Sequence, residues 1–366
     1  MTARRHRPGT AKQARFRTVD VHAHLAPQGY LAEARRGAPG GPRLERNPEG
    51  HEFIVFDEKA PAGYRRMRLM PQEYDHDARL AEMDAGGIDV QVVSLTPPFF
   101  HYWAEPGRGK DFCRMANEEI AGLVRRHPDR FLGMATVPLQ DPPAAAEELA
   151  HARRALGLVG VEIGSNINGR ELDDPALHPF FARCAELRMP VFIHPVVVAG
   201  ADRMARYYLR NLIGNLVDTS IALAHLIYGG TFVRWPGLKV IAAHAGGIIP
   251  YTVGRLDHGY RVRPECRAAL PRRPSSYLRH VYFDTIAHGR EALAYLVRRF
   301  GADRVVLGSD FPFDMADPDP VGTVRDLRGL PARDRSRILG GNAHALFGGG
   351  ARAVSASRTN RAPRSS

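Results

Sequence analysis

The octapeptide TVDVHAHL, residues 18–25, is the stretch that decides the fold. Apolar and polar side chains alternate through it from Val19 to Leu25. A period of two is typical of a β-strand, so His22 and His24 leave the same face of one strand. Buried imidazoles need partners, and two of them on one face make this strand a candidate for metal binding.

Seven further apolar runs follow along the chain, each short, rich in Val and Ile, and bounded by Gly, Pro or Asp. Helical patterns separate them. Eight such strands alternating with helices predict a (β/α)₈ barrel. A doubly wound open sheet is the competing architecture, but the count of eight and the polar residues at the strand ends favour the barrel. The runs cover residues 89–95, 130–139, 158–164, 190–195, 238–247, 280–285 and 304–310.

Residues 26–75 interrupt this alternation as a long insertion after the first strand. We expect residues 51–58 and 64–70 to pair within it as a small hairpin, and the insertion to act as a lid or substrate wall. The predicted domain organisation is one barrel domain over residues 18–348. It is flanked by tails, 1–17 and 349–366, whose basic, Ser- and Ala-rich composition predicts disorder.

The net charge of +12 over 366 residues is concentrated in these tails. Residues 1–17 carry six basic side chains and residues 350–366 carry four, with no acidic side chain in either segment. Subtracting these ten leaves about +2 for the body of the chain. We therefore expect solvated tails with weak polyanion affinity and no nucleic-acid partner, with polyanion binding through the tails as an alternative function.

Other compositional features point to the cytoplasm. There is no run of 18 apolar residues, so we expect no membrane partner, and no apolar segment follows the basic N-terminus as a secretory signal requires. Cys113, Cys184 and Cys266 are widely spaced and odd in number, which is typical of a protein from a reducing compartment.

Three further runs end in polar residues that can bind metal: His194, His244 and Asp310. In a barrel, the carboxyl ends of the strands converge on one opening. His22, His24, His194 and Asp310 then offer three nitrogens and one oxygen to one divalent ion, Zn²⁺ with Mn²⁺ as the alternative. His244 would serve beside it as general acid or base. The alternatives are a packed core histidine for His244 and a helix cap for Asp310.

The motifs VDVHAHL, VFIHP, AHAGG and GSDFPF resemble those of the amidohydrolase superfamily, in its amidohydrolase-2 branch. Within that branch, stretches such as RLAEMDAGGIDVQVVSLTP and TVGRLDHGYRVRP are similar to the 2-amino-3-carboxymuconate 6-semialdehyde decarboxylases. The likeness covers about residues 18–348. It implies release of CO₂ without oxygen or an organic cofactor, one bound metal ion and a homodimer.

The resemblance also implies roles for individual residues. His22, His24, His194 and Asp310 match the family's metal ligands, and His244 matches the histidine that activates the metal-bound water.

Two more residues match substrate contacts by this resemblance, and a third lies nearby. Arg255 matches an arginine that the neighbouring subunit of a dimer supplies to the substrate carboxylate, a role that suits a guanidinium fork. Phe313 matches an aromatic wall of the pocket. His288 falls at the barrel mouth as a candidate substrate contact, with helix capping as the alternative.

The chain departs from the family pattern where substrate binds. Val196 and Asn211 stand where the family has tryptophans, and Met67 aligns with a substrate-binding arginine. Arg66, in the same stretch YRRMRLM, is our candidate for that role, with Arg65 and Arg68 beside it. We therefore expect a reshaped pocket.

Glu162, on the fourth predicted barrel strand, is a carboxylate without an assigned role. It is either a hydrogen-bonded group behind the metal ligands or a bridge to a second metal ion.

Together these features predict a metal-dependent, non-oxidative decarboxylase of an unsaturated or aromatic carboxylic acid, a carbon–carbon lyase located in the cytoplasm. The first rival is a hydrolase or hydratase that uses the same metal site on an amide, lactone or conjugated acid. The second is a non-catalytic member of the fold.

Overall fold

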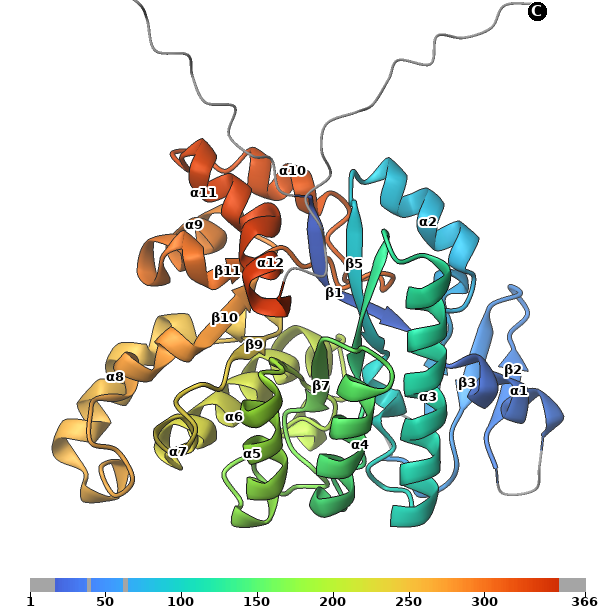
Figure 1. Ribbon diagram of the computed structural model, residues 1–366, viewed down its shortest axis with the longest axis horizontal. Coiled ribbons are helices and arrows are strands. Elements are labelled where there is room, and N and C mark those ends of the chain that lie inside the picture. The colour runs from blue at the N-terminus through green and yellow to red at the C-terminus, as the bar shows by residue number, and fades with distance from the viewer. Residues whose placement is uncertain (1–16, 38–40, 62–64, 349–366) are drawn as a thin grey trace, which may run out of the picture.

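Eight parallel strands form a barrel in the computed structural model, which describes residues 17–37, 41–61 and 65–348 (Figure 1). They neighbour one another in chain order, so all eight predicted runs are strands and the fold class is confirmed. The strands are β1 (Val19–Leu25), β5 (Val90–Leu95), β6 (Phe131–Ala135), β7 (Gly160–Gly164), β8 (Val191–His194), β9 (Val240–Ala242), β10 (Val281–Asp284) and β11 (Val305–Val306).

Backbone hydrogen bonds between the first and last strands close the barrel. The segment after β11 runs beside β1: Asp310 N donates to His22 O at 2.9 Å, and His24 N donates to Phe311 O at 2.8 Å. Ala23 and Phe311 form a parallel bridge. The open sheet, the competing prediction, is therefore wrong.

Helices cover the outside of the barrel and return the chain from one strand to the next (Figure 1). Several begin at an aspartate whose side chain accepts backbone N–H groups of the first turn, as Asp75 does for α2 and Asp141 for α4. The helices are α2 (His76–Ala85), α3 (Pro106–Arg126), α4 (Pro142–Arg154), α5 (His178–Leu187), α6 (Leu216–Tyr228), α7 (Thr231–Arg234), α8 (Ile249–Val262), α9 (Arg290–Phe300), α10 (Pro320–Arg325), α11 (Ala332–Ser336) and α12 (Asn342–Phe347).

Two hydrophobic clusters divide the interior. The larger lies between the strands and the surrounding helices. The smaller contains Val21, Val92 and Ile241 from the strands, and Phe347 of α12 packs with them. Because side chains fill this part of the structure, polar residues at the carboxyl ends of the strands are left to line the site.

The insertion after β1 forms a three-stranded antiparallel sheet of its own. Ile54 pairs with Met67, so the predicted hairpin is confirmed. The prediction missed a helix and a third strand, which here is the charged segment RLER with no apolar alternation to reveal it. The insertion's elements are α1 (Gln28–Arg36), β2 (Arg43–Arg46), β3 (Glu52–Val55) and β4 (Arg66–Arg68).

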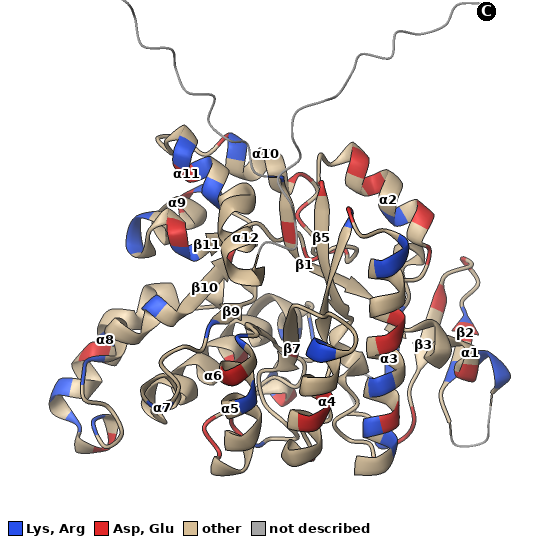
Figure 2. Cartoon of the chain, in the orientation of Figure 1, with Lys and Arg blue, Asp and Glu red and all other residues tan. Residues whose placement is uncertain are grey.

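Acidic and basic residues are interspersed along the outer helices, while the barrel strands carry few of them (Figure 2). This mixture fits the nearly neutral body expected from the sequence. The predicted tails lie outside the described residues except for Arg17, whose guanidinium donates to the backbone oxygens of Asp89 and Asp129. No helix in the described ranges is long and apolar enough to cross a membrane.

Candidate metal centre and active site

The two histidines of β1 point their Nε2 atoms into the barrel mouth because their Nδ1 atoms are already bonded. His22 Nδ1 lies 2.8 Å from Asp284 Oδ2, and His24 Nδ1 lies 3.1 Å from the backbone oxygen of Leu95. Both partners accept hydrogen bonds, so each Nδ1 carries the hydrogen. Each Nε2 therefore presents a lone pair, as a metal-binding imidazole must.

His194, the last residue of β8, has the same arrangement. Its Nδ1 lies 2.9 Å from the backbone oxygen of Pro195, which leaves its Nε2 as the acceptor. The Nε2 atoms of His22, His24 and His194 are all buried and have no hydrogen-bond partner in the part of the chain that the structure describes. Buried acceptors of this kind are costly unless a cation or a donor faces them.

Asp310 brings a carboxylate to these lone pairs. Its Oδ1 lies 3.2 Å from His22 Nε2 and 3.3 Å from His24 Nε2. Lone pairs that face one another at this distance repel, and a divalent cation between them removes the repulsion. Three imidazole nitrogens and one carboxylate oxygen are a donor set for Zn²⁺, Mn²⁺ or a similar ion. The residues present therefore fit a divalent metal.

Donor atoms of His22, His194, His244 and Asp310 all lie within 4.8 Å of one another. His24 is outside that group of four but reaches the same carboxylate. His244 Nε2 lies 3.6 Å from Asp310 Oδ2. The structure thus brings together all five residues singled out at the strand ends.

Electrostatics favour positive charge at this point. Burial lowers the pKa of His22, but the carboxylates of Asp310 and Asp284 outweigh burial and raise it to about 10. The site thus favours one positive charge at His22 Nε2, either a proton or a metal ion that takes the proton's place. Burial dominates elsewhere: it lowers the pKa of His24 to about 4 and that of His194 well below its ordinary value. Burial also opposes ionisation of Asp310, yet the imidazoles around it, His22 first, hold its pKa well below the usual range.

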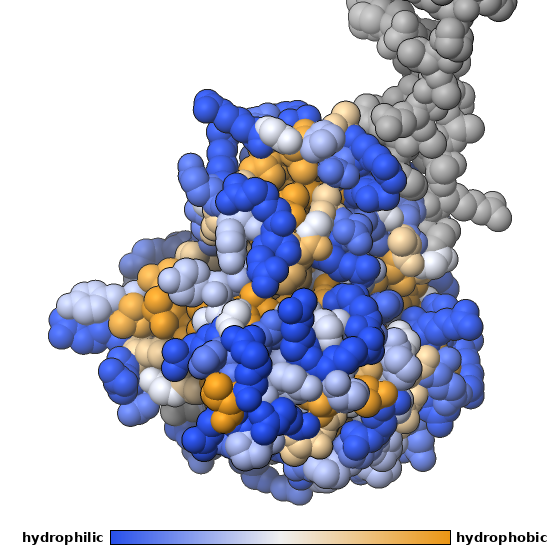
Figure 3. Space-filling model, turned by 90° about the vertical axis from the view of Figure 1, so that its left-hand side faces the viewer, coloured by the Kyte–Doolittle hydropathy of each residue, from blue (hydrophilic) through white to orange (hydrophobic). Residues whose placement is uncertain are grey.

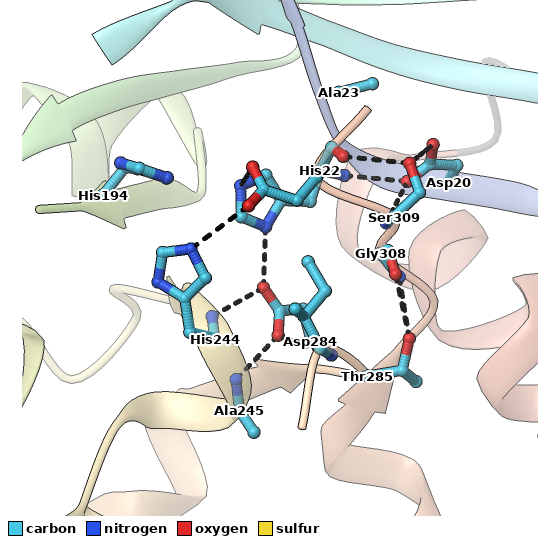
Figure 4. A network of polar contacts seen from close by, with 12 residues as sticks. Asp20, His22, Ala23, His194, His244, Ala245, Asp284, Thr285, Gly308 and Ser309 are labelled. Carbon is cyan, nitrogen blue, oxygen red and sulfur yellow. Dashed lines mark hydrogen bonds and ion pairs between the residues drawn. The ribbon is translucent and has the colours of Figure 1, made fainter. Parts of the chain in front are cut away.

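Asp284, at the end of β10, is a site residue that sequence reasoning missed. Its carboxylate accepts from His22 Nδ1 and from the backbone N–H groups of His244 (2.9 Å) and Ala245 (2.7 Å) (Figure 4). Both of these residues are left-handed, with φ of 53° and 55°. One buried carboxylate thus orients a metal-site histidine and holds the strained turn that presents His244. The signal was available, since the run 280–285 ends in a polar residue.

Asp20 plays a comparable part beside Asp310. Its carboxylate accepts from Ser309 Oγ at 2.6 Å and from Ser309 N at 3.0 Å (Figure 4). Asp310 follows directly, with φ of 63°. His244 and Asp310 were expected to end their strands, but both lie beyond them, in left-handed turns held by buried carboxylates.

Two cavities open from this cluster, and both are lined by His244 and Asp310. The larger, of about 680 Å³, lies toward the insertion and contains β4 side chains in its wall. The smaller, of about 520 Å³, lies toward α8 and α9. Asn211 and Asn215 also line both, so the two cavities share one boundary above the cluster.

The predicted substrate contacts fall in different places. Phe313 lines the larger cavity, with its ring centroid 5.3 Å from that of His24. His288 lines the smaller one. Arg255 is exposed on α8 and lines neither cavity.

Arg66 also lines the larger cavity, but its guanidinium is engaged. Its Nε donates to Glu45 Oε2 at 3.1 Å, and it lies 3.5 Å from the ring centroid of Phe53. Two other arginines of this cavity are freer. The guanidinium of Arg68 forms no ion pair or hydrogen bond within the described ranges. The buried Nε of Arg210, a residue that sequence reasoning missed, has no hydrogen-bond partner there.

The positions that depart from the family pattern line these cavities too. Val196 is in the wall of the larger cavity, and Asn211 is in the walls of both. Glu162 is fully buried, and burial raises its pKa well above the usual value. Its Oε1 lies 3.8 Å from His24 Nδ1, on the side of that imidazole away from Nε2, and Glu162 is not among the clustered donor atoms.

The chain is similar to known proteins over most of its length. The amidohydrolase family model matches residues 19–349. The chain is 35% identical over 332 residues to the 2-amino-3-carboxymuconate-6-semialdehyde decarboxylase of Dictyostelium discoideum, an alignment that covers 90% of this chain and 91% of that protein.

Several solved structures of similar fold are decarboxylases as well. The 5-carboxyvanillate decarboxylase of Sphingomonas paucimobilis superposes with a TM-score of 0.75 at 27% identity, covering 91% of this chain and 99% of that one. The 5-carboxyvanillate decarboxylase of Novosphingobium aromaticivorans, with bound manganese, gives a TM-score of 0.73 at 25% identity, covering 92% and 99%. The prediction of a metal-dependent carboxy-lyase is confirmed, and the chain belongs to the amidohydrolase family.

Proposed function

We propose that the barrel domain, residues 18–348, holds one Zn²⁺ ion on His22, His24, His194 and Asp310 and removes CO₂ from an unsaturated or aromatic carboxylic acid. The observation that carries this proposal is the set of buried Nε2 lone pairs facing the Asp310 carboxylate where the two cavities meet. A divalent ion held there supplies Lewis acidity to the oxygen substituents of the substrate.

His244 is the proton carrier in this proposal. Its Nε2 points toward Asp310 and the clustered donor atoms, where the reacting carbon would lie. The imidazolium donates a proton to the carbon that bears the carboxylate. The C–CO₂⁻ bond then breaks, and its electron pair returns to the conjugated system. The net reaction is R–CO₂⁻ + H⁺ → R–H + CO₂, and His244 regains its proton from solvent.

The larger cavity supplies the groups that orient an anion. Arg68 and Arg210 are open to a second anionic group of the substrate, and Phe313 offers a ring face to stack on. Arg66 stays a candidate only if substrate displaces Glu45 from its guanidinium. Orientation of the leaving carboxylate by such groups is a major source of rate enhancement.

We also propose a homodimer in the cytoplasm, in which Arg255 reaches the neighbouring active site. Arg255 is exposed, and α8 also carries Tyr251, 87% exposed, and Val262, 55% exposed. Figure 3 shows groups of hydrophobic residues between hydrophilic ones on the side that bears α8 and α9. Mixing Arg255→Ala and His244→Ala enzymes should restore activity if the sites are shared. The free cysteines, Cys113, Cys184 and Cys266, suit a reducing compartment.

The test of the function is CO₂ release by purified enzyme of measured metal content. Salicylate-like, hydroxybenzoate and 2-aminomuconate-type acids are incubated with it, and CO₂ is followed by mass spectrometry. Metal-dependent release from any of them supports the proposal, and metal analysis decides between zinc and manganese. A metal content near one per chain without CO₂ from any acid would favour the hydrolase or hydratase.

A further inference from the structure

The smaller cavity has no part in the reaction proposed above, although it reaches the same two residues, His244 and Asp310. It lies between the π-helical turn η6 (Arg210–Asn215), the first turn of α8, and α9 with the loop that precedes it. At about 520 Å³ it falls within the ~300–1,000 Å³ typical of cavities that bind small organic molecules.

Its walls are mainly apolar. Tyr295 presents its ring, because its hydroxyl already donates to Pro250 O at 2.9 Å. No Lys or Arg is among the described residues that line the cavity, and Asp310, the only acid among them, is the metal-site carboxylate. The apolar lining includes Leu212, Pro250, Tyr251, Ile286, Ala287, Ala292, Tyr295, Leu296 and Met315.

The larger cavity also has apolar walls but differs in charge, since Arg66, Arg68 and Arg210 line it together with Asp310 and Asp314. The two cavities meet at His244 and Asp310. An acid whose reacting carbon lies at that boundary therefore has a cavity with three arginines on one side and a cavity without Lys or Arg on the other. A ring that carries only small polar groups would use the first and leave the second to water.

We propose that the smaller cavity is a substrate subsite for an apolar substituent, so that the substrate is an aromatic or unsaturated acid bearing an alkyl chain or a second ring. This inference rests on the proposed function. A buried methylene is worth about fourfold in affinity, so a propyl group seated in the cavity should improve binding at least about tenfold.

The experiment compares 2-hydroxybenzoate with its 4-propyl and 5-propyl derivatives as substrates. Phenol and the matching propylphenols are titrated as products by calorimetry, which reports binding without turnover. The variant Ala292→Phe places a ring in the cavity from an exposed position on α9. Glu291→Phe, on the neighbouring exposed residue that does not line the cavity, is the matched control.

We expect kcat/KM for one propyl isomer to exceed that for 2-hydroxybenzoate at least about tenfold, mainly through KM. Ala292→Phe should bring this ratio close to one, and Glu291→Phe should retain it. An unsubstituted acid that is equally good, or a ratio that Ala292→Phe leaves unchanged, overturns the subsite. So does an altered subunit assembly in Ala292→Phe without altered selectivity, because the partner subunit would then fill the cavity.

The calorimetric titrations with phenol and the propylphenols distinguish a failure of this inference from a failure of the proposed function. If no acid releases CO₂ but a propylphenol binds at least about tenfold more tightly than phenol, and only Ala292→Phe removes the difference, the subsite stands and the decarboxylase proposal fails. If CO₂ is released but propyl groups bring no gain in KM or in product binding, the function stands and the subsite fails.

Discussion

The cluster of candidate metal ligands at the strand ends differs from the rim, formed by Arg66, Arg68 and Arg210 of the larger cavity, in how its side chains are held. Each imidazole of His22, His24 and His194 has its Nδ1 bonded, so its Nε2 is aimed by the barrel itself. The arginines of the rim are on the insertion and on a π-helical turn, and the exposed guanidinium of Arg68 has no partner in the described ranges. The cluster is thus preorganised for one chemistry, whereas the rim is free to vary with the substrate.

Removal of the metal should have the largest effect, because every proposed step depends on the cluster. Dialysis against a chelator is expected to lower kcat to background, and one equivalent of Zn²⁺ or Mn²⁺ per chain to restore it. Metal content and CO₂ release are measured on the same samples. Activity that persists without metal would refute the assignment of the cluster.

His244→Ala should have the second largest effect on kcat. Loss of the proton carrier is expected to lower kcat by roughly 10²–10⁴-fold. The metal should remain, because His22, His24, His194 and Asp310 are untouched. Metal analysis of the variant is the control, and full turnover in a metal-loaded variant would show that another group moves the proton.

Glu73 lies near the end of the insertion and its carboxylate bonds Thr96, which follows β5. The pH dependence of the free energy of unfolding tests this contact between the insertion and the barrel. Burial raises the pKa of Glu73 to about 7, although Thr96 Oγ and Met70 N donate to its carboxylate. The native chain therefore holds a proton that the unfolded chain releases near pH 4.5, and stability falls as the pH rises toward 7. Urea unfolding should show wild type losing roughly 3 kcal/mol relative to Glu73→Gln between pH 4.5 and 7.5. If the free energies of unfolding of wild type and Glu73→Gln changed in parallel with pH, the raised pKa of Glu73 would be contradicted.

Asp284→Asn should weaken metal binding by roughly 10–100-fold, the range usual for a group that orients a metal-binding histidine. The amide presents N–H groups to the backbone donors of His244 and Ala245, so the turn also loosens. Chelator competition measures the affinity, and Asp129→Asn, at an exposed position, is the control. An affinity equal to that of wild type would mean that the barrel alone orients His22.

Substitution of the rim arginines should give the smallest effects, and these should appear in KM. Arg68→Ala is expected to raise KM for an acid with a second anionic group by about tenfold, the value of one charge-assisted hydrogen bond, with little change in kcat. Arg66→Ala should change KM less, because Glu45 and Phe53 already engage that guanidinium. The reverse order would assign the substrate contact to Arg66, the candidate from the sequence.

Sequence periodicity alone predicted the eight strands, the barrel and the residues of the cluster. Val19–Leu25 shows why: alternation along a strand reports which side chains share a face, and parallel strands of a barrel deliver their carboxyl ends to one opening. The elements it missed, α1 and β2, are in the insertion. β2 is a short, charged and largely exposed strand that leaves no apolar pattern. α1 does bury Tyr30, Leu31 and Ala34, but a helix of nine residues repeats that spacing too few times to stand out in the sequence.

The tertiary structure alone decided how the site is held and where substrate can lie. Asp284, from β10, reaches His22 on β1 and the turn of His244, contacts that span 262 and 40 residues. Arg210 and the apolar cavity beside α9 likewise depend on segments that meet only after folding. The sequence determined the chemistry, because side-chain type and strand period are local properties. Orientation and cavity shape depend on packing between distant segments, which no local pattern records.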